Sequence, residues 1–160
     1  MNRDDLQRFC AGRDDLRYHL HAPWSRGEWS YATNGHIVVR VQKLADVGEN
    51  PDAPNAEKLF AETKRGEFVP VPVCESPPDV DCTYCRGSGM VRNCGMPDDC
   101  CMCNGSGKTE CKDGAKVGDA NFQKRYLAMI QGWEIAPNGP ISAAWIRNGD
   151  ASGLLMPRRA

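Results

Sequence analysis

The feature that most constrains this chain is a pattern that occurs twice, Cys-x-x-Cys-x-Gly-x-Gly, at residues 82–89 and 100–107. Two residues between the cysteines of a pair allow both thiolates to reach one ion from a tight turn, and two such pairs complete a tetrahedron. The sequence therefore predicts one structural Zn²⁺ held by four cysteines, which are Cys82, Cys85, Cys100 and Cys103.

The glycines that follow each cysteine pair have a separate role. Glycine adopts a positive φ without steric cost, which turns backbone N–H groups toward the sulfur atoms. Hydrogen bonds of this kind orient and support metal ligands. Because four thiolates leave no open coordination position, the pattern indicates a structural ion rather than a catalytic one.

The two repeats closely resemble the cysteine-rich zinc region of DnaJ-type chaperones, a family that carries four such repeats and binds two zinc ions. Here the resemblance covers about residues 80–109, and two repeats imply one site. The His-Pro-Asp motif of the J-domain does not occur in the sequence. We therefore do not expect recruitment of a heat-shock ATPase, and a truncated chaperone-like module that binds unfolded polypeptides is kept as an alternative function.

Five cysteines lie outside the pattern, namely Cys10, Cys74, Cys94, Cys101 and Cys111. Cys10 falls on the apolar face of an expected helix, where a buried cysteine acts as a small core residue. Cys101 competes with Cys100 as a ligand, although the register with Cys100 keeps both glycines in place. Cys94 and Cys111 flank the second repeat and could join or replace a ligand. A thiol-redox role would need a thioredoxin-like βαβ setting, which the sequence lacks.

Composition limits the remaining function classes. A chain of 160 residues with 41% apolar residues fits one domain with a small insert. The net charge of −1 argues against a polycation that binds nucleic acid by charge alone. No apolar run reaches the ~18 residues of a membrane span, and the polar N-terminus does not read as a signal peptide. We therefore expect a cytoplasmic protein, whose cysteines serve metal or thiol chemistry rather than disulfides.

Residues 1–79 combine helical and alternating patterns and end in an acidic, proline-rich connector. The Asn34-Gly35 pair between two apolar runs is the strongest hairpin signal in this half. The expected elements are a helix over 2–11 capped by Asn2, a strand over 18–22, a hairpin over 29–41, a helix near 54–63 with Ala56, Leu59 and Phe60 facing inward, and an edge strand over 67–73.

Residues 115–160 repeat this order of elements after the cysteine segment 80–114. Apolar residues at i, i+4, i+7 and i+8 predict a helix over 119–131, namely Phe122, Tyr126, Met129 and Ile130. Three strands follow at 133–136, 141–147 and 152–156. The sequence thus predicts one α+β domain, mainly an antiparallel sheet with two or three helices, which is interrupted by a zinc-knuckle insert.

Three stretches resemble bacterial sliding clamps, the β subunit of DNA polymerase III. The run from Tyr31 to His36 is similar to the Ala-Thr-Asp-Gly-His stretch of clamps, although Asn34 replaces the acid and Ile37 replaces an arginine. Residues 122–130 resemble the last clamp helix, and residues 153–158 its final strand with the Met-Pro-Met-Arg ending. In clamps, the first and last of these stretches help to line a pocket for short peptide motifs. The resemblance implies clamp-like half-repeats and a partner-binding set of Thr33, Gly35, His36, Leu155, Met156, Pro157 and Arg158.

No catalytic motif appears in the sequence. The preferred hypothesis is a non-enzymatic, zinc-stabilised binding or adaptor protein, a clamp-like accessory of a phage or mobile element. We expect a protein or peptide partner, with nucleic acid as a further option and no small-molecule substrate. Leu155 and Met156 would form the floor of the binding site, and His36 and Arg158 its rim. A thiol-redox or metal-dependent enzyme is the least favoured alternative.

Overall fold

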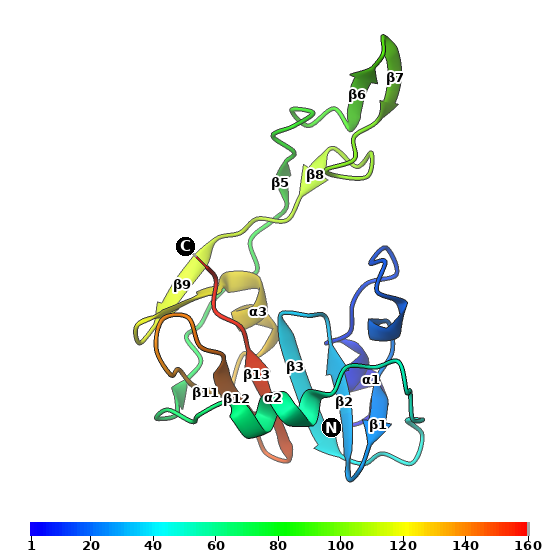
Figure 1. Ribbon diagram of the computed structural model, residues 1–160. Coiled ribbons are helices and arrows are strands. Elements are labelled where there is room, and N and C mark those ends of the chain that lie inside the picture. Colours follow the sequence, from blue (N-terminus) through cyan, green and yellow to red (C-terminus); the bar gives the residue numbers. More distant parts are fainter. Residues whose placement is uncertain (160) are drawn as a thin grey trace.

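The computed structural model describes residues 1–159 and contains a seven-stranded antiparallel sheet (Figure 1). The strand order is β1-β2-β3-β13-β12-β11-β4. The bounds along this order are β1 (Trp24–Arg26), β2 (Trp29–Thr33), β3 (Ile37–Gln42), β13 (Ala151–Leu155), β12 (Ala144–Asn148), β11 (Glu134–Ala136) and β4 (Val69–Pro70).

Six of the seven strands form two three-stranded halves, β1–β3 and β11–β13, that meet at their last strands, and β4 pairs with the outer edge of β11. β3 and β13 pair antiparallel, with Val39 opposite Gly153 and Ile37 opposite Leu155. Residues more than a hundred positions apart in the chain therefore become neighbours at the centre of the sheet. This is the arrangement expected if the two halves repeat one motif.

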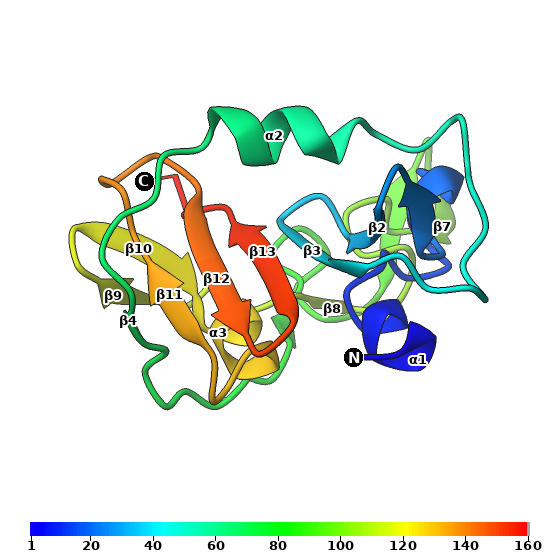
Figure 2. The same cartoon turned by 90° about the horizontal axis from the view of Figure 1, so that it is seen from below.

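Successive side chains along each strand point to opposite faces of the sheet, and both faces are covered by packed side chains. On β3, Ile37, Val39 and Val41 face the larger core, whereas Val38 faces the smaller one. Helices α1 (Arg3–Gln7) and α3 (Lys124–Met129) cover the first face, and α2 (Ala56–Glu62) covers the second (Figure 2). The expected fold class, α+β with a mainly antiparallel sheet, is thus confirmed.

Local sequence signals explain several boundaries. The Asn2 side chain accepts from the Asp5 backbone while the Asp5 carboxylate accepts from the Asn2 backbone, so a capping box starts α1. The Asn34 side chain accepts hydrogen bonds from the backbone of His36 and Ile37 and so fixes the β2–β3 turn. Val69–Pro70 forms a two-residue strand at the sheet edge, as the prolines of this segment predict.

Several sequence expectations are wrong. The helix over 2–11 ends already at Gln7, and the strand over 141–147 begins only at Ala144. The strand over 18–22 is a 3₁₀ helix at Tyr18–Leu20, whose single buried side chain is Leu20. The helix over 119–131 begins only at Lys124, because residues 120–123 form strand β10 (Ala120–Gln123), which pairs with β9 (Gly114–Val117). On α2, Leu59 is 51% exposed, and only Ala56 and Phe60 of the three expected residues are buried.

The cysteine segment projects from the end of the sheet (Figure 1). Strands β5 (Val80–Asp81) and β8 (Lys108–Thr109) pair at its base, and β6 (Met90–Asn93) and β7 (Met96–Asp99) form a hairpin at its tip. Its buried cluster consists of four cysteines with Val91 packed against them. Within residues 1–159, no helix has the length and apolar character needed to cross a membrane.

Candidate metal centre and apolar pocket

The four cysteines of the repeated pattern converge in the projecting module. Their Sγ atoms all lie within 4.8 Å of one another. The Sγ atoms of Cys82 and Cys100 are 3.8 Å apart, and those of Cys85 and Cys103 are 3.7 Å apart. All four residues are buried. Four thiol groups this close can hold a single metal ion.

The two knuckles support the sulfur atoms in the same way. The Gly89 backbone N–H donates to the Cys85 Sγ, and the Gly107 N–H donates to the Cys103 Sγ, both at 3.2 Å. Gly89 and Gly107 have φ angles of 75° and 73°, in the left-handed region that favours glycine. Each repeat therefore supplies a positioned N–H donor to its own second cysteine, as the glycine pattern predicts.

The knuckles are also interlocked. The Cys82 N–H donates to the Gly107 carbonyl and the Cys100 N–H donates to the Gly89 carbonyl, both at 2.8 Å. A Cβ atom added to Gly89 would overlap the Gly105 carbonyl oxygen, and one added to Gly107 would overlap that of Gly87. The module therefore depends on backbone-to-backbone contact between the repeats, in addition to the four thiols.

The environment makes the thiols unequal. Desolvation by burial raises the pKa of Cys100 to about 12. Burial also acts to raise the pKa of Cys85, but the Gly89 N–H and hydrogen bonds with the other three thiols lower it to about 7. Such a group shares protons when metal-free, and a metal ion would displace them, so metal affinity would depend on pH.

The other cysteines do not join this group. Cys94 and Cys101 are exposed, whereas Cys100 is fully buried beside the other ligand candidates. Among residues 1–159, the four-cysteine group is the one cluster of cysteine, histidine and acidic side chains close enough to share an ion. Cys94, Cys101 and Cys111 therefore lie outside this cluster.

A second candidate site is a cavity of about 430 Å³ on the face of the sheet that α2 covers. Its walls come from the β2–β3 turn, the β13 end, the 3₁₀ helix and α2. The lining is mostly apolar and includes Leu20, Trp24, Ile37, Val38, Pro54, Ala56, Leu59, Ala143, Leu154 and Met156.

Four of the seven partner-binding residues suggested by the clamp resemblance line this cavity. They are Thr33, Gly35, His36 and Met156. The Met156 N–H donates to the His36 carbonyl at 2.9 Å, which joins the two distant sequence stretches directly. The remaining three residues do not line it. Leu155 is fully buried in the larger core on the other face, Pro157 is buried and Arg158 is exposed. Leu154 occupies the floor position that the sequence suggested for Leu155.

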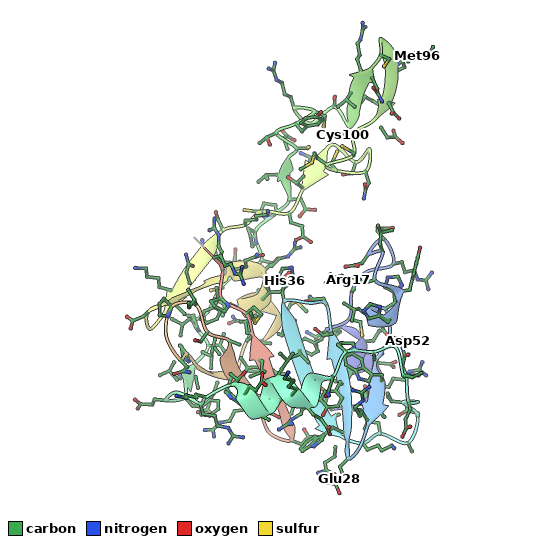
Figure 3. All side chains as sticks on the ribbon, in the orientation of Figure 1. Arg17, Glu28, His36, Asp52, Met96 and Cys100 are labelled. Atoms are coloured by element: carbon green, nitrogen blue, oxygen red, sulfur yellow. The ribbon has the colours of Figure 1, made fainter. Side chains whose placement is uncertain are left out.

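Cationic and imidazole groups rim the cavity. Arg17 lies beside Gly35, where it donates to the Asn34 carbonyl at 3.1 Å and to the Asp15 carboxylate. These hydrogen bonds hold the pKa of Asp15 well below its usual range. His36 stacks on Tyr126 with ring centroids 5.4 Å apart. Both His36 and Arg17 lie at the end of the domain nearest to the cysteine module, opposite Glu28 (Figure 3).

Sequence reasoning missed Arg17, Trp24 and Leu154 as cavity residues. Alternation along residues 151–155 could have separated Leu154 from Leu155, since adjacent strand residues face opposite sides. Arg17 and Trp24 lie in segments without a motif, and no local signal points to them.

No family model matches the sequence, and no curated protein matches it. Solved structures do match. One is a DnaN sliding clamp (DNA polymerase III subunit beta) from Pseudomonas aeruginosa bound to griselimycin, with a TM-score of 0.47 and 12% identity. Another is a DNA polymerase sliding clamp from the same organism, with a TM-score of 0.41 and 14% identity. Each alignment covers 100% of this chain, which spans 64% and 66% of those chains.

Proposed function

We propose that this protein is a non-enzymatic binding or adaptor protein that captures a short peptide segment in the apolar cavity. One observation carries the proposal: the β2–β3 turn and the end of β13 form one mostly apolar cavity with Arg17 and His36 in its lining. Concave, mostly apolar sites with a few polar groups are typical of ligand binding. The same two stretches resemble those that line the peptide pocket of sliding clamps, and this resemblance also favours a short peptide as the ligand.

The residues that line the cavity indicate which kind of peptide would bind. Leu154, Val38 and Met156 offer an apolar floor for one or two apolar side chains. Trp24 is 1% exposed, and its Nε1–H has no acceptor in residues 1–159. A buried donor without a partner is costly, so a ligand that brings a carbonyl or carboxylate acceptor would relieve it. At the rim, Arg17, which is paired with Asp15, and His36 can donate hydrogen bonds to a polar group beside the apolar anchors.

Peptide titration tests this function. Peptides of the type that clamps bind, with two apolar anchors and one acid, should shift the amide NMR signals of Thr33, His36 and Met156. Met156→Ala should weaken binding by roughly tenfold, because truncating a well-packed anchor contact costs ~1–2 kcal/mol. Met90→Ala removes a methionine of similar exposure, 46% against 44%, in strand β6 of the module and serves as the matched control. Equal affinities for both variants would exclude the cavity as the binding site.

We further propose that residues 80–114 form a zinc-stabilised unit inserted between the halves 1–79 and 115–160. The four thiols suit zinc, which binds thiolates tetrahedrally in structural sites. Purified protein should hold about one zinc ion per chain. Cys82→Ser and Cys103→Ser should abolish zinc binding, whereas Cys10→Ser, outside the cluster, should retain it. Zinc at full occupancy in the first two variants, measured by elemental analysis, would reject the assignment.

A chaperone-like function is a second candidate because the module exposes apolar side chains. Tyr84, Met96 and Met102 are 64%, 73% and 64% exposed. Exposed methionines suit promiscuous binding of apolar segments. If this function holds, the protein should suppress aggregation of a denatured client, and replacing Met96 and Met102 by glutamine should abolish suppression. The peptide cavity would be unaffected by these changes.

A further inference from the structure

A second hollow lies on the other flank of α2. It has a volume of about 500 Å³ and is lined by Trp29, Arg40, Glu57, Phe60, Ala61, Thr63, Arg65 and Trp145. Only Thr63 also lines the peptide cavity. The Trp145 Nε1–H donates to the Thr63 carbonyl at 2.9 Å, which fixes the end of the α2 segment against the sheet. The two hollows are therefore separate, and they differ in chemistry.

Aromatic rings hold two guanidinium groups in this hollow. The Arg40 Cζ lies 4.3 Å from the Trp29 ring centroid and 4.0 Å from that of Phe60. The Arg65 Cζ lies 4.2 Å from the Trp145 centroid, and the Arg40 Cζ is 5.8 Å from the same ring. The two cations thus gather around one indole. Cation–π contacts orient a guanidinium without neutralising it.

Neither guanidinium is paired with a carboxylate. The ion pairs found in residues 1–159 include neither Arg40 nor Arg65. Arg40 is partly buried and donates through Nε to the Ser152 hydroxyl at 3.2 Å. Glu57 is the one acid in the lining, and its Oε1 lies next to Gly27 in the β1–β2 turn. Most N–H donors of the two arginines therefore remain available to an external oxyanion.

The neighbouring flat groups indicate which oxyanion fits. Arginine matches phosphate in a bidentate geometry, which makes it well suited to phosphate recognition. The Trp29 indole carries Arg40 over one face and is partly exposed, and the Arg65 side chain is exposed above Trp145. Both offer a flat surface on which a nucleobase can stack. Duplexes hide the faces of their bases, so the combination favours a single strand over a double helix.

We propose that this hollow binds a nucleotide unit of single-stranded nucleic acid, with a phosphate on Arg40 and Arg65 and a base stacked on Trp29. The site is distinct from the peptide cavity and would give the protein a second ligand. An acidic peptide has the negative charge of a nucleic acid strand but lacks a planar base, whereas a free nucleotide has both. The experiment separates these three ligands.

Fluorescence anisotropy of the full chain with labelled oligothymidylate tests the proposal. A strand of about 20 nucleotides exceeds the ~4–16 nucleotides of typical single-strand sites. Arg65→Gln should weaken binding about tenfold and reduce the slope of log K against log salt by about 1. Lys64→Gln removes the same charge from the adjacent exposed residue, which does not line the hollow, and should weaken binding less than about twofold.

Two further measurements complete the test. Arg40→Lys keeps the charge but loses the bidentate geometry, so it should also weaken binding, with unchanged near-ultraviolet circular dichroism to establish folding. Trp29→Leu should weaken the binding of the strand more than it weakens the binding of inorganic phosphate. Equal losses for Arg65→Gln and Lys64→Gln would overturn the proposal, as would absence of strand binding. Displacement of the strand by polyglutamate at equal charge would assign the hollow to acidic peptides. Saturation by thymidine monophosphate without strand binding would assign it to free nucleotides.

Discussion

Replacing Gly89 by alanine tests how strongly the metal centre depends on the contact between the two knuckles. A Cβ atom at this position would overlap the Gly105 carbonyl oxygen, which is backbone and cannot rotate away. The φ angle of 75° adds conformational strain. The substitution would also displace the N–H that donates to the Cys85 Sγ at 3.2 Å. We therefore expect a marked loss of metal affinity although all four cysteines are present.

Gly95→Ala is the control variant with which the loss of metal affinity in Gly89→Ala is compared. Gly95 lies in the β6–β7 turn with a φ angle of 84°, and a Cβ atom there would meet nothing within 4 Å. It therefore carries only the left-handed backbone strain, ~1–2 kcal/mol. Gly89→Ala carries the same strain together with the overlap and the disturbed ligand support. Loss of groups that support metal ligands typically lowers affinity by ~10–100-fold, which is the expected ratio between the two variants.

Competition with a chromophoric zinc chelator measures this ratio. Wild-type protein, Gly95→Ala and Gly89→Ala should release zinc at successively lower chelator concentrations. Equal affinities for the two variants would refute the reasoning, because they would mean that the overlap is relieved at no cost. Intact tryptophan signals in the near-ultraviolet circular dichroism spectrum should accompany all three proteins, since Trp24, Trp29, Trp133 and Trp145 lie outside the module.

Three further outcomes are expected. Chelation of the metal should unfold residues 80–114 and leave the sheet intact, because the module lacks an apolar core of its own; loss of the tryptophan spectrum on chelation would contradict this. Leu155→Ala should lower the free energy of unfolding in urea by ~2–5 kcal/mol, since Leu155 is fully buried. Met156→Ala, at a site 44% exposed, should cost less than ~1 kcal/mol, and the reverse order would contradict the assigned faces. Burial raises the pKa of Cys10 from 9.0 to about 11, so the folded state holds this proton more tightly. The free energy of unfolding should therefore fall as the pH rises from 9 to 11. Cys10→Ser should reduce this dependence on pH, and an unchanged dependence in the variant would contradict the prediction.

Features set by local chemistry could be predicted from the sequence. The Asn34 side chain fixes its own turn through bonds to residues two and three positions away, so the hairpin follows from its own residues. The cysteine cluster likewise follows from the spacing within each repeat, because each knuckle carries its own glycines and sulfur hydrogen bonds. The pairing of β3 with β13 is consistent with the repeated order of elements in the two halves.

Features for which the sequence pattern fits two structures equally well could not be predicted. Phe122, Tyr126 and Ile130 are spaced by four, which satisfies both the helical period and the alternation of a strand. The pairing of β10 with β9 decides in favour of a strand at Phe122. At Tyr18–Leu20, alternation suggested a strand, but the His21 ring bonds to the Asp15 carbonyl at 2.6 Å and closes a compact local turn. Arg40 is polar between buried valines, and this signal could have pointed to the second hollow.

The pairing of β3 with β13 has a consequence for biosynthesis. While the ribosome is still making the module and the second half, the nascent chain carries β3 as an unprotected sheet edge with its apolar face uncovered. The peptide cavity is incomplete until the second half has been synthesised and residues 152–155 have paired with residues 37–40. Contacts of this sequence separation slow folding, so the first half is exposed to aggregation or chaperone capture throughout synthesis. Binding competence would then arise in one late step, when the second half closes onto the first.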